Sequence, residues 1–155
     1  MSRLILLDSG PLGLIVGPPG RPHVARCLTW LKAISSTGTT IIIPEIAHYE
    51  VRRELIRIRS VGSLRRLDYA LDLKSGLKHL TLTTEAMIKA AEFWAFLRRA
   101  GIPTASPEAL DADAILAGQT ALVGQPGDEV IVATTNLAHL VRFPAIDARI
   151  WDQVR

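Results

Sequence analysis

The sequence predicts a single α/β domain of residues 1–155, built as a three-layer α/β/α sandwich around a central, mostly parallel sheet of four to five strands. The chain has 155 residues, 48% of them hydrophobic, which is enough apolar surface for one core. Short aliphatic and β-branched runs alternate with longer segments whose apolar residues recur at helical spacing. This alternation is typical of βαβ units, which place helices on both faces of a parallel sheet.

The first half of the chain supplies two strands. Residues 3–7 (RLILL) form an apolar run that predicts a buried strand, and Asp8 follows it in a predicted turn rich in glycine and proline. Residues 39–43 are all β-branched and predict the second strand, which Pro44 ends. Helices are expected over residues 22–34 and from Glu45 onward, the second with an apolar stripe at Ile46, Tyr49, Leu55 and Ile58.

The second half continues the alternation. We expect a short helix over residues 64–74, then a strand over residues 79–82, then a helix that Thr83 or Thr84 caps and that Gly101 ends. A polar, proline-marked loop is expected over residues 102–108. The remaining expected elements are a helix over 110–122, a strand over 129–133 and a weaker fifth strand over 148–151.

The composition excludes several classes of protein. The single cysteine, Cys27, excludes an internal disulfide framework and a thiolate-rich zinc site, and it suits a reducing compartment such as the cytoplasm. Cys27 lies among apolar residues at helical spacing, which favours a core position over a nucleophile. The longest apolar stretch, residues 4–16, is broken at Asp8 and is too short to span a membrane.

Arginine dominates the positive charge. The formal net charge is +3, but 14 of the 18 basic residues are Arg, and six of them lie between residues 52 and 66. Arg side chains recognise phosphates well, so Arg52, Arg53 and Arg57 are candidates for contact with a polyanionic partner. The other interpretation is a solvated helix face, on which Glu50 and Glu54 pair with neighbouring arginines.

Three acids stand where a parallel sheet would bring them together. Asp8 follows the first strand, Glu50 lies one to two turns into the helix after the second, and Asp113 is expected in the first turn of the helix before the fourth. Convergent carboxylates repel one another, and a hard divalent cation relieves that repulsion. The pattern indicates magnesium or manganese and phosphodiester hydrolysis, although each acid alone also fits a cap or a surface ion pair.

Four segments carry a resemblance to a known family. They are LILLDSGPLG, IIIPEIAHYEVRREL, LDADAILAGQTAL and VIVATTNLAHL, and together they extend from near the N-terminus to beyond Asn136. In order and spacing they resemble the PIN-domain ribonucleases, which include the toxin halves of VapBC-type toxin–antitoxin pairs. The resemblance implies that Asp8, Glu50 and Asp113 are both catalytic residues and metal ligands and that Asn136 is a further catalytic residue. It also implies that Arg52, Arg53 and Arg57 bind the RNA.

One position departs from the family pattern. The family often has a hydroxyl residue and then a fourth acid after the next strand, and those positions here hold Thr134 and Asn136. Asn136 can bind through its carbonyl oxygen but brings no charge, so a second metal ion is expected to bind more weakly. Asp111 is expected to compensate, Ser9 and Thr134 to support the site, and His139 is a weaker candidate.

The resemblance implies an endoribonuclease that uses Mg²⁺ or Mn²⁺ on single-stranded or looped RNA, with a small antitoxin as partner and a homodimer as assembly. Two alternatives stay open. A phosphohydrolase with Asp8 as covalent nucleophile would need a second Asp where Gly10 stands. The second alternative is a catalytically weak PIN-like module that binds RNA or protein. Asn136, which stands in place of a fourth acid, favours this alternative.

Overall fold

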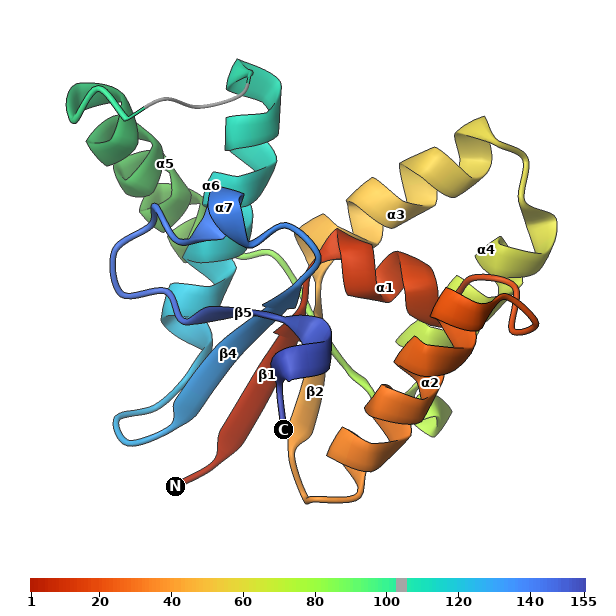
Figure 1. Ribbon diagram of the computed structural model, residues 1–155. Coiled ribbons are helices and arrows are strands. Elements are labelled where there is room, and N and C mark those ends of the chain that lie inside the picture. Colours follow the sequence, from red (N-terminus) through yellow and green to blue (C-terminus); the bar gives the residue numbers. More distant parts are fainter. Residues whose placement is uncertain (103–105) are drawn as a thin grey trace.

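The computed structural model describes residues 1–102 and 106–155, apart from the side chains of residues 107–109. A five-stranded, all-parallel sheet has the order β3-β2-β1-β4-β5, with helices on both faces, and this confirms the predicted fold class (Figure 1). The strands are β1 (Arg3–Leu7), β2 (Thr40–Pro44), β3 (Lys78–Leu80), β4 (Glu129–Thr134) and β5 (Ala148–Ile150).

The strand order changes direction at β1. The chain adds β2 and then β3 on one side of β1, and it later returns to place β4 on the other side. Ile5 is in register with Ile41 of β2 and with Ile131 of β4. Because all strands are parallel, their carboxyl ends meet at one edge of the sheet, and the crevice beside β1 at that edge is where ligands bind in such folds.

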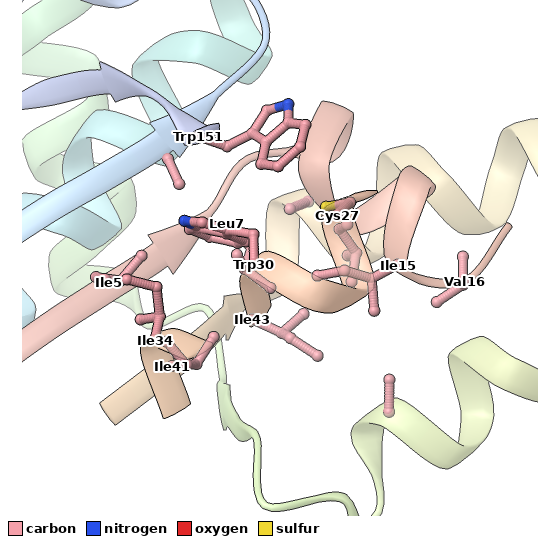
Figure 2. Packing of buried hydrophobic residues seen from close by; sticks show 14 of the residues in the cluster. Ile5, Leu7, Ile15, Val16, Cys27, Trp30, Ile34, Ile41, Ile43 and Trp151 are labelled. Carbon is pink, nitrogen blue, oxygen red and sulfur yellow. The ribbon is translucent and has the colours of Figure 1, made fainter. Parts of the chain in front are cut away.

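The helices form two layers, and the side chains of each strand alternate between them. Ile5 and Leu7 of β1 pack in one apolar cluster with α1 and α2, whereas Leu6 packs in the other with α5 and α6. Figure 2 shows the first cluster, in which Trp30 and Trp151 meet. The helices are α1 (Ser9–Ile15), α2 (Pro22–Ser35), α3 (Glu45–Arg57), α4 (Val61–Leu71), α5 (Thr84–Arg99), α6 (Pro107–Val123) and α7 (Leu137–Leu140).

Cys27 is a core residue, as expected. Its side chain is fully buried in the first cluster (Figure 2), and burial raises the pKa of its thiol to about 12. A thiol held in its neutral form is a poor nucleophile, so Cys27 contributes packing. None of the helices in the described part of the chain is long and apolar enough to cross a membrane.

The segment after Asp8 is a helix, and the expectation of a turn there is wrong. The Asp8 carboxylate caps α1 by accepting a hydrogen bond from the backbone N–H of Ser9 at 2.7 Å. Pro11 lies in the first turn, where its missing N–H costs no hydrogen bond. Burial of Pro11, Leu12 and Ile15 offsets the low helix propensity of the glycines.

Two further boundaries differ from expectation. Helix α6 begins at Pro107, so Asp113 lies in its second turn and not in its first. Residues 103–105 of the expected loop lie outside the described residues. The expected helix over 64–74 is α4 followed by the 3-10 turn Leu73–Ser75, because Asp72 is extended and its carboxylate accepts a hydrogen bond from the N–H of Lys74 at 2.8 Å.

Candidate active site

A cavity of about 530 Å³ opens at the carboxyl edge of the sheet. Its lining comes from α1, α3, α6 and α7 and from the residues that follow β1 and β4, and Figure 1 shows how these elements are arranged. The three predicted acids all line it, although they come from widely separated segments. Its lining residues are Asp8, Ser9, Gly10, Glu50, Arg53, Ser106, Ala112, Asp113, Thr135, Asn136 and His139.

Asp8 is the most firmly oriented of the acids. One carboxylate oxygen accepts the Ser9 N–H, and the other accepts a hydrogen bond from the Thr134 hydroxyl at 2.7 Å. The Thr134 hydroxyl is fully buried and in turn accepts the N–H of Asn136 at 3.0 Å. Thr134 therefore acts through Asp8, by holding its carboxylate at the cavity wall.

Glu50 comes from α3, on the other side of the cavity. Burial and the negative charge of Asp8 raise the pKa of its carboxyl to about 7, and the charge of Asp113 adds to this effect. The guanidinium of Arg53 opposes the shift from 3.7 Å away. Near neutral pH this carboxyl is poised between its two protonation states.

Asp113 comes from α6. Burial and the charge of Asp8 raise its pKa to about 6, while His139 and Arg142 act in the opposite direction. The Nδ1 atom of His139 lies 3.3 Å from a carboxylate oxygen of Asp113. The short helix α7, which the sequence analysis did not predict, delivers His139 to the cavity. His139 follows Asn136 by three positions. On a helix this spacing puts two side chains on one side, so it is the sequence signal that could have placed His139 beside Asn136.

The donor set suits a hard divalent cation, because it consists of carboxylates that repel one another in a half-buried cavity. Within residues 1–102 and 106–155, however, no three side chains from His, Cys, Asp and Glu are arranged as a ready metal-ligand group. The acids thus share one cavity without being drawn together in it.

The remaining predicted residues divide into two groups. Ser9 and Asn136 line the cavity with the acids. Asp111 does not: it is exposed and lines a separate hollow between α5 and α6. It therefore lies outside the cavity in which it was expected to replace the missing fourth acid.

The three predicted RNA-binding arginines also differ in their surroundings. Arg52 donates hydrogen bonds to His48 at 2.7 Å and to Asp68 at 2.6 Å, and Arg57 pairs with Glu54 through two nitrogens. Arg53 is the one that lines the acid cavity. It also lines a second hollow between α1 and α3, which shares Ser9, Gly10 and Glu50 with the first.

Gly10 closes the cavity against the end of β4. A Cβ atom at this position would lie 2.2 Å from the hydroxyl oxygen of Thr135, which is far closer than real Cβ contacts. A second acid two residues after Asp8, as the phosphohydrolase alternative requires, therefore has no space in this fold. The need for glycine here arises from a contact between residues 125 positions apart, so local sequence could not indicate it.

No family model matches the sequence, and no curated protein matches it either. Solved structures do match over nearly the full chain. A chain of VapBC from Salmonella typhimurium bound to DNA has a TM-score of 0.67 and 23% identity, over 97% of this chain and 99% of that chain. A chain of VapBC2 from Rickettsia felis bound to a fragment of its promoter has a TM-score of 0.68 and 15% identity, over 96% and 99%.

A third match is VapC20 from Mycobacterium tuberculosis, described as a toxin that cleaves the sarcin–ricin loop. It has a TM-score of 0.58 and 13% identity, and the match covers 88% of this chain and 93% of that chain. At these identities the three likenesses establish a shared fold.

Proposed function

Because the chain has the fold of the VapBC-type PIN-domain toxins over nearly its full length, we propose that it is a metal-dependent endoribonuclease that cleaves single-stranded or looped RNA. One observation carries the proposal. Asp8, Glu50 and Asp113 reach one cavity from three separate segments, and the charge of Asp8 raises the pKa of both other acids. Stability alone gives no reason to gather such charges, whereas cation binding does.

The three carboxylates would hold Mg²⁺ or Mn²⁺, and the bound ion would supply an activated water and stabilise the leaving oxygen of the phosphodiester. Thr134 and the N–H of Ser9 fix the orientation of Asp8 by hydrogen bonds. Asn136 would contribute its side-chain carbonyl, without charge, at the cavity mouth. Removal of any one acid should therefore weaken both cation binding and cleavage.

The RNA would run along the groove formed by the acid cavity and the adjoining hollow between α1 and α3. The two hollows share Ser9, Gly10, Glu50 and Arg53, which makes them continuous. Arg53 stands where they join and would meet the phosphate nearest the acids. Arg52 and Arg57 lie on the same helix and would contribute less, since each is already paired with an acid of the protein.

We also propose a small antitoxin as partner, a homodimer as assembly, and the cytoplasm as location. The names VapBC and VapBC2 of similar structures support the antitoxin. Exposed apolar side chains on α5, among them Ile88 and Phe96, would gain from burial in a dimer. The single reduced cysteine is compatible with the cytoplasm.

A catalytically weak module that binds RNA or a protein is the second candidate. Two observations favour it: Asn136 stands in place of a fourth acid, and the described residues hold no ready metal-ligand group. Such a module would bind RNA with the same groove but would not need the acids for its affinity. Cleavage activity distinguishes the two candidates.

The decisive experiment incubates purified protein with an end-labelled, mixed-sequence single-stranded RNA in Mg²⁺, Mn²⁺ or EDTA. We expect cleavage with either ion, none in EDTA, and a loss of roughly 100-fold or more in Asp8→Asn. Asp152→Asn is the matched control, because Asp152 pairs with Arg26 outside the cavity. Cleavage that survives Asp8→Asn, or that depends on Zn²⁺ alone, would refute the assignment of the site.

A further inference from the structure

We propose that Tyr49 and Arg53 form a platform on which one nucleobase of the single-stranded RNA stacks, directly beside the acid cavity. The inference rests on the proposed function and deepens it, because it assigns an aromatic and a cationic contact to the substrate. It concerns binding of the RNA, not the chemical step.

The first observation is the position of Tyr49. The apolar pattern of α3 predicts a core residue here, yet 57% of the Tyr49 surface is exposed. Tyr49 directly precedes Glu50 on α3, and side chains of consecutive helical residues point about 100° apart. A single exposed aromatic residue is ordinary on its own. The surroundings of this ring make it distinctive.

The second observation is the contact between Tyr49 and Arg53. The guanidinium carbon of Arg53 lies 5.2 Å from the centre of the Tyr49 ring, and a guanidinium nitrogen lies 3.7 Å from Glu50. Positions three and four apart on a helix are neighbours, which is why one arginine reaches both residues. Arg53 thus connects the exposed ring to the edge of the acid cavity.

The third observation is that Arg53 is held by an ion pair alone. Its nitrogen lies 3.7 Å from Glu50, beyond hydrogen-bond distance, and within the described part of the chain Arg53 makes no hydrogen bond. Arg52 and Arg57, on the same helix, are by contrast bonded to acids. A planar cation with unused donors, stacked on an aromatic ring beside a groove, suits a nucleotide, whose phosphate takes the donors and whose base takes the ring.

The position of the pair favours RNA over a protein partner. Arg53 lines both hollows of the proposed RNA path and also lies over the Tyr49 ring, so a strand whose phosphate meets Arg53 would bring a neighbouring base to the ring. Stacking on an aromatic ring accepts any base, because every base has a π-face. The platform would therefore strengthen binding without selecting a sequence by itself.

The test measures affinity for a fluorescently labelled single-stranded RNA by anisotropy in EDTA, where no cleavage occurs. Tyr49→Ala should weaken binding roughly tenfold, and Tyr49→Phe should retain affinity because it keeps the ring. The chain offers a matched control in its other tyrosine: Tyr69 is 60% exposed but lies on α4, and within the described residues no cation lies over its ring. Tyr69→Ala should leave the affinity unchanged.

Salt dependence separates the two members of the platform. Arg53→Ala should weaken binding and reduce the salt slope by about one phosphate contact, whereas Tyr49→Ala should leave the slope unchanged. Arg65→Ala, which removes an exposed arginine of α4, controls for net charge. An RNA that lacks the base at the stacked position should bind wild type more weakly than the intact RNA does. In Tyr49→Ala the two RNAs should bind equally well.

Several outcomes would overturn the platform. Unchanged affinity in Tyr49→Ala would do so, as would an equal loss in Tyr49→Phe, which would point to the hydroxyl group. A change of oligomeric state by light scattering in Tyr49→Ala, with RNA affinity intact, would make the ring a protein contact. Failure of the nuclease proposal looks different: wild type would bind RNA with the platform intact but cut nothing in Mg²⁺ or Mn²⁺.

Discussion

Thr134 and Asp8 are joined by a hydrogen bond of 2.7 Å although they are 126 residues apart in the chain. The bond links the ends of β4 and β1, which are neighbours in the sheet. Its donor is fully buried, so the contact depends on the sheet being fully assembled. The orientation of the first acid is thus a property of the fold and not of its local sequence.

Thr134→Val should impair the proposed RNA cleavage through Asp8. The substitution preserves side-chain volume but removes the donor to Asp8 and the acceptor for the N–H of Asn136. We expect a loss of stability of about 1 to 3 kcal/mol by chemical denaturation, and roughly tenfold slower RNA cleavage. Thr134→Ser keeps the hydroxyl and should retain most of both. Equal effects of Val and Ser would show that packing, and not the hydrogen bond, is what matters.

The raised pKa values of Glu50 and Asp113 predict a pH-dependent stability. With pKa values of about 7 and about 6 in the folded protein, these acids hold protons that the unfolded chain has already released. The free energy of unfolding should therefore fall as pH rises from about 4.5 to about 7, and the stabilisation is lost above that range. Thermal melts in EDTA across this range should show the decline.

Glu50→Gln provides the control for this pH dependence. Its melting temperature should exceed that of wild type at about pH 8 in EDTA, and the two should converge near pH 4.5. Addition of Mg²⁺ should raise the melting temperature of wild type more at about pH 8 than at about pH 5, because the ion competes with protons for the carboxylates. A larger effect of Mg²⁺ at the lower pH would contradict a carboxylate site.

Two glycines of α1 should respond oppositely to alanine. A Cβ at Gly10 would lie 2.2 Å from the Thr135 hydroxyl, whereas a Cβ at Gly13 would meet nothing within 4 Å. Gly10→Ala should therefore destabilise the protein by about 1 to 3 kcal/mol, since the end of β4 must shift. Gly13→Ala should stabilise it by about 0.5 to 1 kcal/mol in urea unfolding. Similar effects at both positions would mean that the contact with Thr135 is not tight.

Gln119 should be essential to the position of Glu50. Its buried side chain accepts a hydrogen bond from the N–H of Ile46 at 3.2 Å and donates one to the carbonyl of Leu80 at 3.0 Å. It thereby fixes the N-terminus of α3, where Pro44 provides no side-chain cap. Gln119→Leu should lower stability by roughly 2 kcal/mol, because a buried N–H and a partly buried carbonyl lose their partners.

A weaker response to Mg²⁺ should accompany that loss, since α3 carries Glu50. Gln119→Glu is a useful comparison: it keeps the acceptor for Ile46 but replaces the donor to Leu80. Full stability of Gln119→Leu in urea unfolding would show that α3 is held by its apolar contacts alone.

The strands and most helices could be predicted because their signals are local. Residues such as Ile5, Leu6 and Leu7 alternate between two buried clusters, and an all-apolar run is the pattern of a strand covered on both faces. Helix α1 was missed because its stability comes from the burial of Pro11, Leu12 and Ile15, which overrides the poor helix propensity of its glycines. The apolar pattern of α3 predicts that Tyr49 is buried, and this is wrong because its ring is exposed. Burial depends on which elements pack against the helix as well as on the spacing of apolar residues.

The sequence by itself determined the fold class, the core position of Cys27 and the expectation that Asp8, Glu50 and Asp113 meet at one sheet edge. Chain order and periodicity suffice for these, since parallel strands carry their ends to the same edge. Tertiary structure alone decided that Asp111 lies outside the cavity, although it is two residues from Asp113. Helix positions that are two residues apart point about 200° away from each other. Only the packing of α6 therefore selects whether Asp111 or Asp113 faces the cavity.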